Sequence, residues 1–228
     1  MVKKYKVPLI EALLRDRFLF LLISLLSLIL IAPLLGEYVN LNTLSDIIIT
    51  AIFLSAIYAI SKKERYFFIS LLLLLPVLVA IWLSHFVNTP FLRLVGNCCG
   101  ILFFAFTIII ILSAIFRENE VTLDVIYGAI AVYLLMALMW AFIYEVIDAL
   151  KPNAFSVTGE ALEVSRHHFF YYSFVTITTV GYGDITPVSL VARSFSILEM
   201  LIGQIYLVVL IARLVGINIS QSIDRRPR

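Results

Sequence analysis

Six long apolar runs constrain this chain more than any other feature of its sequence. A helix rises about 1.5 Å per residue and therefore needs about 20 apolar residues to cross the hydrocarbon core of a bilayer. Backbone groups in lipid must find their hydrogen bonds within the segment, so each run is predicted to be a helix. The runs occupy residues 18–35, 44–60, 66–84, 91–116, 123–147 and 190–219.

The composition agrees with a chain that is surrounded mainly by lipid. Hydrophobic residues make up 62% of the sequence and charged residues only 14%, whereas soluble domains have about 45–50% and 25%. A large soluble core would not require apolar runs of this length. The net charge of +2 gives no indication of a nucleic-acid partner. We therefore expect an all-α membrane protein with six transmembrane helices.

A seventh apolar run, at residues 168–178, is too short to cross a bilayer. It is followed at once by a segment that contains Gly181 and Gly183. Irregular backbone is tolerated at membrane depth only where protein surrounds it or where it lines a water-filled path. This pattern predicts a re-entrant pore helix and loop. We divide the chain into a four-helix transmembrane domain at 1–120 and a pore domain at 121–228.

The distribution of basic residues predicts the orientation of the chain. Loops in the cytoplasm carry an excess of Lys and Arg, and 13 of the 17 basic residues lie on one side of the predicted helices. The other side carries Arg93, Lys151, Arg166 and Arg193. We expect the protein in the cytoplasmic membrane, with both termini in the cytoplasm. The re-entrant loop then enters from the outside. The short C-terminal tail leads us to expect no cytoplasmic ligand-binding domain.

The segment Thr179-Val180-Gly181-Tyr182-Gly183-Asp184 resembles the potassium-channel signature. Its context also resembles the pore of that family, because an outer helix, a short pore helix and an inner helix surround it in the expected order. The inner-helix sequence at 203–216 is similar to that of bacterial ion channels with six transmembrane helices. The resemblance implies a selectivity filter at 179–183 that binds K⁺ ions.

The filter chemistry explains why these residue types are needed. Rings of backbone carbonyl oxygens replace the water that a potassium ion sheds. Gly181 and Gly183 can adopt positive φ angles at no steric cost, which lets successive carbonyls point the same way. The hydroxyl of Thr179 can supply the innermost ligands, while Val180 and Tyr182 turn away from the ions. Each chain provides one quarter of such a cage, so we expect a homotetramer.

Four residues around the motif are expected to support the filter: Tyr171, Tyr172, Thr178 and Asp184. Tyr171 and Tyr172 occupy positions where many family members have a Trp pair. The resemblance implies an aromatic cuff whose hydroxyls bond near Tyr182, although simple packing is the alternative. Asp184 lies at the outer mouth, where it either braces the filter or concentrates cations.

Two residues of the inner helix carry gating hypotheses. Gly203 matches the family's hinge glycine by its distance from the filter, and hinge bending and close helix packing remain open. Glu199 is a carboxylate inside a membrane helix, which is a functional-site hypothesis by default. It is expected to face the pore helix or a neighbouring subunit, as a structural hydrogen-bonding group or as a gating group. By alignment with the family, Gln204, Leu207 and Ile211 are expected to face the cavity or the lower pore.

The fourth apolar run lacks the basic residues of a voltage sensor. Its only flanking charges are Arg93 and Arg117, with none between them, whereas steep gating uses three or four charges per subunit. We therefore expect a potassium channel with weak or no voltage dependence. The alternatives are a non-conducting regulatory subunit of a heteromeric channel and a component of a potassium transporter. No nucleophile–base or metal-ligand constellation suggests an enzyme.

Overall fold

The computed structural model describes residues 17–36, 41–61, 64–87, 89–118, 120–158 and 166–224. Seven α-helices account for most of this part of the chain. They are α2 (Arg17–Gly36), α3 (Leu41–Ile60), α4 (Glu64–Leu83), α5 (Pro90–Ile115), α6 (Leu123–Leu150), α7 (Arg166–Ile177) and α8 (Leu190–Asp224). The basic residues in 1–16 and 225–228, and Lys62 and Lys63, which contributed to the predicted orientation, lie outside the described residues.

The protein is a multi-pass membrane protein by the length and hydropathy of its helices. Within the described residues, α3, α4, α5, α6 and α8 are each long and apolar enough to span a bilayer. The first predicted span corresponds to α2, of which the stretch Arg17–Ile31 is apolar but shorter than the other five. Pro76 lies inside α4, where the membrane environment tolerates it.

Local sequence signals explain where two of these helices begin. Pro90 is the first residue of α5, a position where its missing N–H costs no hydrogen bond. The side chain of Thr122 accepts a hydrogen bond from the backbone N–H of Val125 and so caps the start of α6. Both signals mark the start of a helix, directly after the connection that separates two apolar runs.

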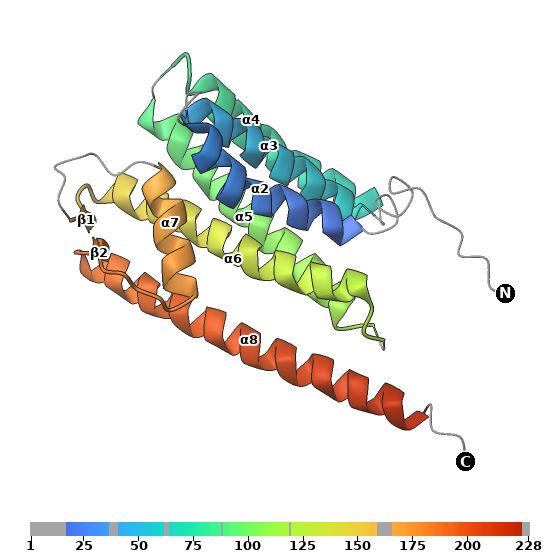
Figure 1. Ribbon diagram of the computed structural model, residues 1–228. Coiled ribbons are helices and arrows are strands. Elements are labelled where there is room, and N and C mark those ends of the chain that lie inside the picture. Colours follow the sequence, from blue (N-terminus) through green and yellow to red (C-terminus); the bar gives the residue numbers. More distant parts are fainter. Residues whose placement is uncertain are drawn as a thin grey trace.

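The long helices run roughly alongside one another, as Figure 1 shows. The start of α2 and the end of α8 lie at the right-hand end of the view, and α7 with its two short strands lies at the left-hand end. Helix α6 packs against α2 and α5 on one side and against α7 and α8 on the other. It therefore joins the four preceding helices to α7 and α8.

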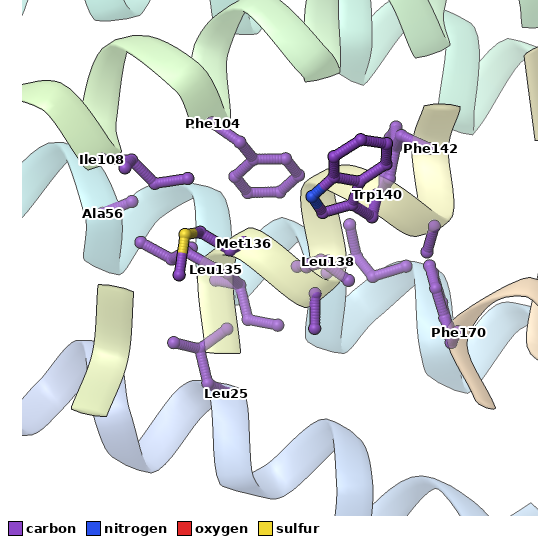
Figure 2. Packing of buried hydrophobic residues seen from close by; sticks show 14 of the residues in the cluster. Leu25, Ala56, Phe104, Ile108, Leu135, Met136, Leu138, Trp140, Phe142 and Phe170 are labelled. Atoms are coloured by element: carbon purple, nitrogen blue, oxygen red, sulfur yellow. The ribbon is translucent and has the colours of Figure 1, made fainter. Parts of the chain in front are cut away.

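The core lies around α6 and is rich in aromatic side chains. Figure 2 shows Leu138, Trp140 and Phe142 of α6 among residues of neighbouring helices. The ring of Phe53 in α3 lies 4.8 Å from that of Phe104 in α5, and the ring of Phe104 lies 5.5 Å from that of Phe142. These contacts fix α6 relative to the first four helices by close packing.

Two features of the fold differ from the sequence-based expectations. A short antiparallel ladder pairs β1 (Phe155–Val157) with β2 (Ile185–Pro187), although no strand was predicted. Such three-residue strands carry too few residues for an alternating pattern to be recognised. In addition, α8 continues to Asp224, beyond the predicted end at residue 219. The prediction ended where the apolar run ends, but the polar residues that follow are also helical.

Candidate functional site

The C-terminal end of α7 binds the backbone of the segment that follows it. The amides of Val180 and Gly181 both donate to the carbonyl oxygen of Val175, at 3.0 and 3.4 Å, and the amide of Thr179 donates to that of Thr176 at 2.9 Å. The last carbonyls of a helix have no partner within the helix and carry its negative dipole end. Here they turn three successive amides of 179–181 toward α7.

The backbone of this segment alternates between two conformations. Thr179, Gly181 and Gly183 have φ angles of 59°, 57° and 80°. In an ordinary strand the side chains and carbonyl groups of successive residues point to opposite sides. A left-handed residue at every second position lets successive carbonyl groups point to the same side instead. Positive φ is easy for glycine, but it is unusual for a β-branched threonine. The conformation of Thr179 was not predicted, and such strain is characteristic of functional sites.

The carbonyl oxygens of residues 179–182 accept no hydrogen bond from any described residue. The side chains of this stretch are also uncovered within one chain, since Val180 is 52% exposed and Tyr182 is 73% exposed. Irregular backbone with unpaired carbonyls is not stable in lipid, and it requires either protein or a water-filled path around it. The segment is thus built to face other groups than those of its own chain.

The far end of the segment is held by the ladder of β1 and β2. The amide of Thr158 donates to the carbonyl oxygen of Asp184 at 2.8 Å, and the amide of Val188 donates to that of Ala154 at the same distance. The segment 179–183 is therefore fixed at one end by α7 and at the other end by residues that precede α7. This second anchor is absent from the sequence-based interpretation.

Tyr171 and Asp184 interact beside the segment. A hydrogen bond to Asp184 is the main cause that raises the pKa of Tyr171 to about 12. The same bond is the main cause that lowers the pKa of Asp184 below its ordinary value. The carboxylate of Asp184 is therefore stabilised in its ionised form, and Tyr171 is held as the neutral donor.

The other two predicted support residues bind elsewhere within the chain. The hydroxyl of Tyr172 is buried and lies 2.7 Å from the Ser196 hydroxyl of α8, rather than near Tyr182. The hydroxyl of Thr178 donates to the carbonyl oxygen of Phe174 at 2.7 Å, in the last turns of α7. Tyr172 thus connects α7 to α8, and Thr178 closes the end of α7.

Glu199 lies at the contact between α8, α7 and α6. Its side chain is fully buried. One oxygen accepts a hydrogen bond from the hydroxyl of Tyr144 of α6 at 2.5 Å, and the other lies 2.5 Å from the hydroxyl of Ser173 of α7. The predicted orientation toward the pore helix is what the contacts show, and the gating role of Glu199 stays a prediction.

Gly203 lies one turn further along α8, where that helix approaches the end of α7 closely. A Cβ atom on Gly203 would lie 2.6 Å from Cγ1 of Ile177 and 2.9 Å from its carbonyl oxygen. The same carbonyl accepts a hydrogen bond from the hydroxyl of Tyr133 of α6 at 3.0 Å. Close packing thus requires glycine at this position, whether or not the helix also bends there.

The residues expected to line the cavity lie away from α6 and α7. Gln204 and Ile211 are exposed in the single chain, and Leu207 is half-buried. In the apolar 18-residue stretch with which α8 could span a bilayer, 6% of the residues are buried, against 61% in the corresponding stretch of α6. Most of α8 is therefore available to contact something other than its own chain.

An ion cluster at the start of α7 was not identified from the sequence. Arg166 pairs with Glu145 of α6 and with Asp46 of α3. Burial opposes the charge of Arg166, but the two carboxylates outweigh it and raise the pKa of the guanidinium. A signal was present, because acidic residues inside apolar runs are rare and usually have a partner. Asp46 and Glu145 are two such residues.

Helix α5, which corresponds to the fourth predicted span, has no row of basic residues of the kind that a voltage sensor needs. Arg93 is exposed near its start, and Arg117 follows its end. The interior of α5 contributes Phe103 and Phe104 to the core and contains no basic residue.

Comparison with known proteins identifies the class to which this arrangement belongs. Residues 98–219 match the family model described as an ion channel. This match covers more than half of the chain, from within α5 through most of α8. Protein LctB of Geobacillus stearothermophilus is 32% identical over 108 residues, which cover 45% of this chain and 79% of that protein. Protein LctB of Bacillus caldotenax is 31% identical over 102 residues, which cover 42% and 75%. No solved structure matches the chain significantly.

Proposed function

The chain belongs to the ion channel family, and from this premise we propose that it is the subunit of a homotetrameric, potassium-selective channel with six membrane spans and a re-entrant pore helix, α7. It conducts K⁺ passively, and the ions bind to the carbonyl oxygens of residues 179–183. The names of the two LctB proteins state no activity. The selectivity assignment therefore rests on the site itself.

One observation carries the proposal. The amides of 179–181 are used by the end of α7, while the carbonyls of 179–182 are free and φ is positive at every second residue, at positions 179, 181 and 183. This arrangement supports a row of carbonyl oxygens on one side of the strand, which is the ligand type that replaces the hydration shell of K⁺. A single strand cannot surround an ion, so symmetric copies must complete the cage.

The exposed surface of one chain supports the same assembly. The segment 179–183 and most of α8 are uncovered, and they lie together on the side of the molecule away from α2 to α5 (Figure 1). A tetramer with α8 nearest the axis would cover Tyr182 and Val180 with neighbouring chains. It would also leave Gln204 and Ile211 on the side of the water-filled cavity.

Ion flux from vesicles tests the proposed function. Purified protein reconstituted into liposomes is expected to release K⁺ and to leave Na⁺ largely inside. Gly181→Asp places a side chain at a left-handed position and a charge in the filter, so this variant is expected to lose the K⁺ preference. Gly216→Ala, whose Cβ meets nothing within 4 Å, is the matched control. Equal K⁺ and Na⁺ flux through the wild-type protein would contradict the proposal.

A further inference from the structure

Arg166, the first residue of α7, connects the pore helix to the helices that precede it. Its Nε lies 2.9 Å from Oε1 of Glu145 in α6, and its Nη1 lies 3.0 Å from Oδ1 of Asp46 in α3. We call these three residues the Arg166 clamp. The guanidinium is well suited to this task, because its fixed fork of N–H groups can hold two carboxylates in defined directions.

A second layer of contacts fixes both carboxylates of the clamp. Oδ2 of Asp46 lies 3.0 Å from Nε2 of His85, which follows α4. Oε2 of Glu145 accepts a hydrogen bond from the side-chain amide of Asn97 in α5 at 2.9 Å. Every carboxylate oxygen of the clamp therefore has a partner. Through these contacts the start of α7 is tied to α3, α5 and the end of α4.

The charged side chains of the clamp are largely shielded from solvent. The side chains of Asp46 and Glu145 are 9% and 11% exposed, and that of Arg166 is 23% exposed. The guanidinium also lies over the ring of Phe142, at 5.9 Å from its centre. Charged hydrogen bonds that are shielded from water are stronger than those at an exposed site. Loss of the Asp46 charge leaves Arg166 with Glu145 of α6 as its only ionised partner in the clamp, which weakens the tie of α7 to α3. Loss of Asp46 or of the Arg166 fork should therefore move or loosen the first turn of α7.

A displacement of that turn would reach the filter through the body of α7. The helix is only 12 residues long, about 18 Å at the usual rise, and a packed helix moves as a unit. Its last turn holds the amides of Thr179, Val180 and Gly181. Carbonyl cages for ions depend on ligand positions, so a tilt that starts at Arg166 changes the geometry at the other end.

We propose that Arg166 is a positioning residue for the ion filter, and that the four-helix part of the chain sets the orientation of α7 through its contact with Asp46. This inference rests on the proposed function. It gives the first four helices a role other than voltage sensing, for which α5 lacks the charges. The competing explanation is an ion pair that stabilises the fold and has no influence on the filter.

Permeability ratios of reconstituted variants test the proposal. Asp46→Asn removes the negative charge from the α3 half of the clamp, and Arg166→Lys keeps the charge but lacks the fork that holds both carboxylates. Each is expected to lower the K⁺/Na⁺ permeability ratio by about fivefold or more, within the range of couplings between contacting residues. Glu64→Gln, which removes the same charge from an exposed position on α4, is expected to leave the ratio unchanged. An unchanged ratio in folded Asp46→Asn and Arg166→Lys channels would overturn the proposal.

Hydrogen exchange of the α7 amides separates failure of this inference from failure of the proposed function. Asp46→Asn is expected to increase exchange in the first turns of α7 and not in α4, whatever ion the protein conducts. If the wild-type protein shows no K⁺ preference, the proposed function fails while the exchange measurement still tests the clamp. Unchanged exchange in α7 would overturn the clamp independently of any flux. Where Asp46→Asn does not fold, Arg166→Lys decides the result by the same two measurements.

Discussion

The hydroxyl of Ser173 in α7 lies 2.5 Å from Oε1 of Glu199 in α8. The same hydroxyl lies 2.6 Å from the carbonyl oxygen of Ala137 in α6. A serine hydroxyl has one hydrogen and can donate only one bond. If that hydrogen goes to Ala137, then the second short contact needs a hydrogen from the side chain of Glu199. A side chain at this position that donates to Ser173 and accepts from Tyr144 would satisfy the whole cluster.

Replacing Glu199 tests this hydrogen count. In Glu199→Gln the new side chain would donate through its amide and accept through its carbonyl, so this variant is expected to keep the thermal stability of the assembled protein close to that of the wild type. Glu199→Leu removes the acceptor to which the buried Tyr144 hydroxyl donates, at a cost of about 1–3 kcal/mol. Thermal melting in detergent, followed by loss of the assembled species, measures both. Equal destabilisation by the two substitutions would contradict the expectation.

Gly203→Ala tests the close approach of α8 to α7. The added methyl group would overlap Ile177, including its backbone oxygen, and backbone cannot move aside as a flexible side chain does. We expect a large loss of K⁺ flux with α8 displaced from the end of α7. Gly216→Ala on the same helix adds an equal methyl group that meets nothing within 4 Å in its own chain, so this variant should leave the approach of α8 to α7 unchanged. Normal flux through Gly203→Ala would show that the approach is not needed for conduction.

Tyr171→Phe tests the hydrogen bond that lowers the pKa of Asp184. An acid with a lowered pKa contributes stabilisation that is present above its ordinary pKa of 3.8 and is lost as the pH falls through the lowered value. Removing the donor raises the pKa of Asp184 toward the ordinary value. We expect protonation of Asp184 at the outer end of the proposed filter to reduce the current, with a midpoint at a higher external pH in Tyr171→Phe than in the wild type.

The matched control for this titration is Tyr127→Phe, which also removes one tyrosine hydroxyl, but near the start of α6. Its inhibition midpoint should equal that of the wild type. Identical midpoints for all three proteins would show that the bond between Tyr171 and Asp184 does not control the ionisation that current recordings detect.

The conductance should depend little on voltage. One charge that crosses the full field gains about 2.3 kcal/mol per 100 mV, and steep gating uses three or four of them in each subunit. The interior of α5 has no basic residue. Planar-bilayer recordings at both polarities are therefore expected to show open probability changing only weakly, and a steep sigmoidal curve would contradict this account.

Much of the fold could be predicted because hydropathy alone determines which segments a bilayer accepts. The six predicted runs correspond to α2, α3, α4, α5, α6 and α8, and the short run corresponds to α7. Gly181 and Gly183 were also predicted to adopt positive φ, and both do. These features depend on length, polarity or the absence of a side chain, all of which can be read locally.

The contacts between distant residues could not be predicted in the same way. The pairing of Arg166 with Asp46 joins residues 120 positions apart, and apolar periodicity does not say which helices are neighbours. The β1–β2 ladder brings together two three-residue segments on either side of α7. The positive φ of Thr179 is imposed by bonds at both ends of the segment and opposes the intrinsic preference of threonine.

A density map of the protein purified in K⁺ tests whether residues 179–183 form an ion filter. We expect four chains around one axis, with residues 179–183 nearest the axis and ion density between successive rings of their carbonyl oxygens. A map in which this segment lies away from any shared axis, or in which a single chain stands without copies to complete the ring, would contradict it.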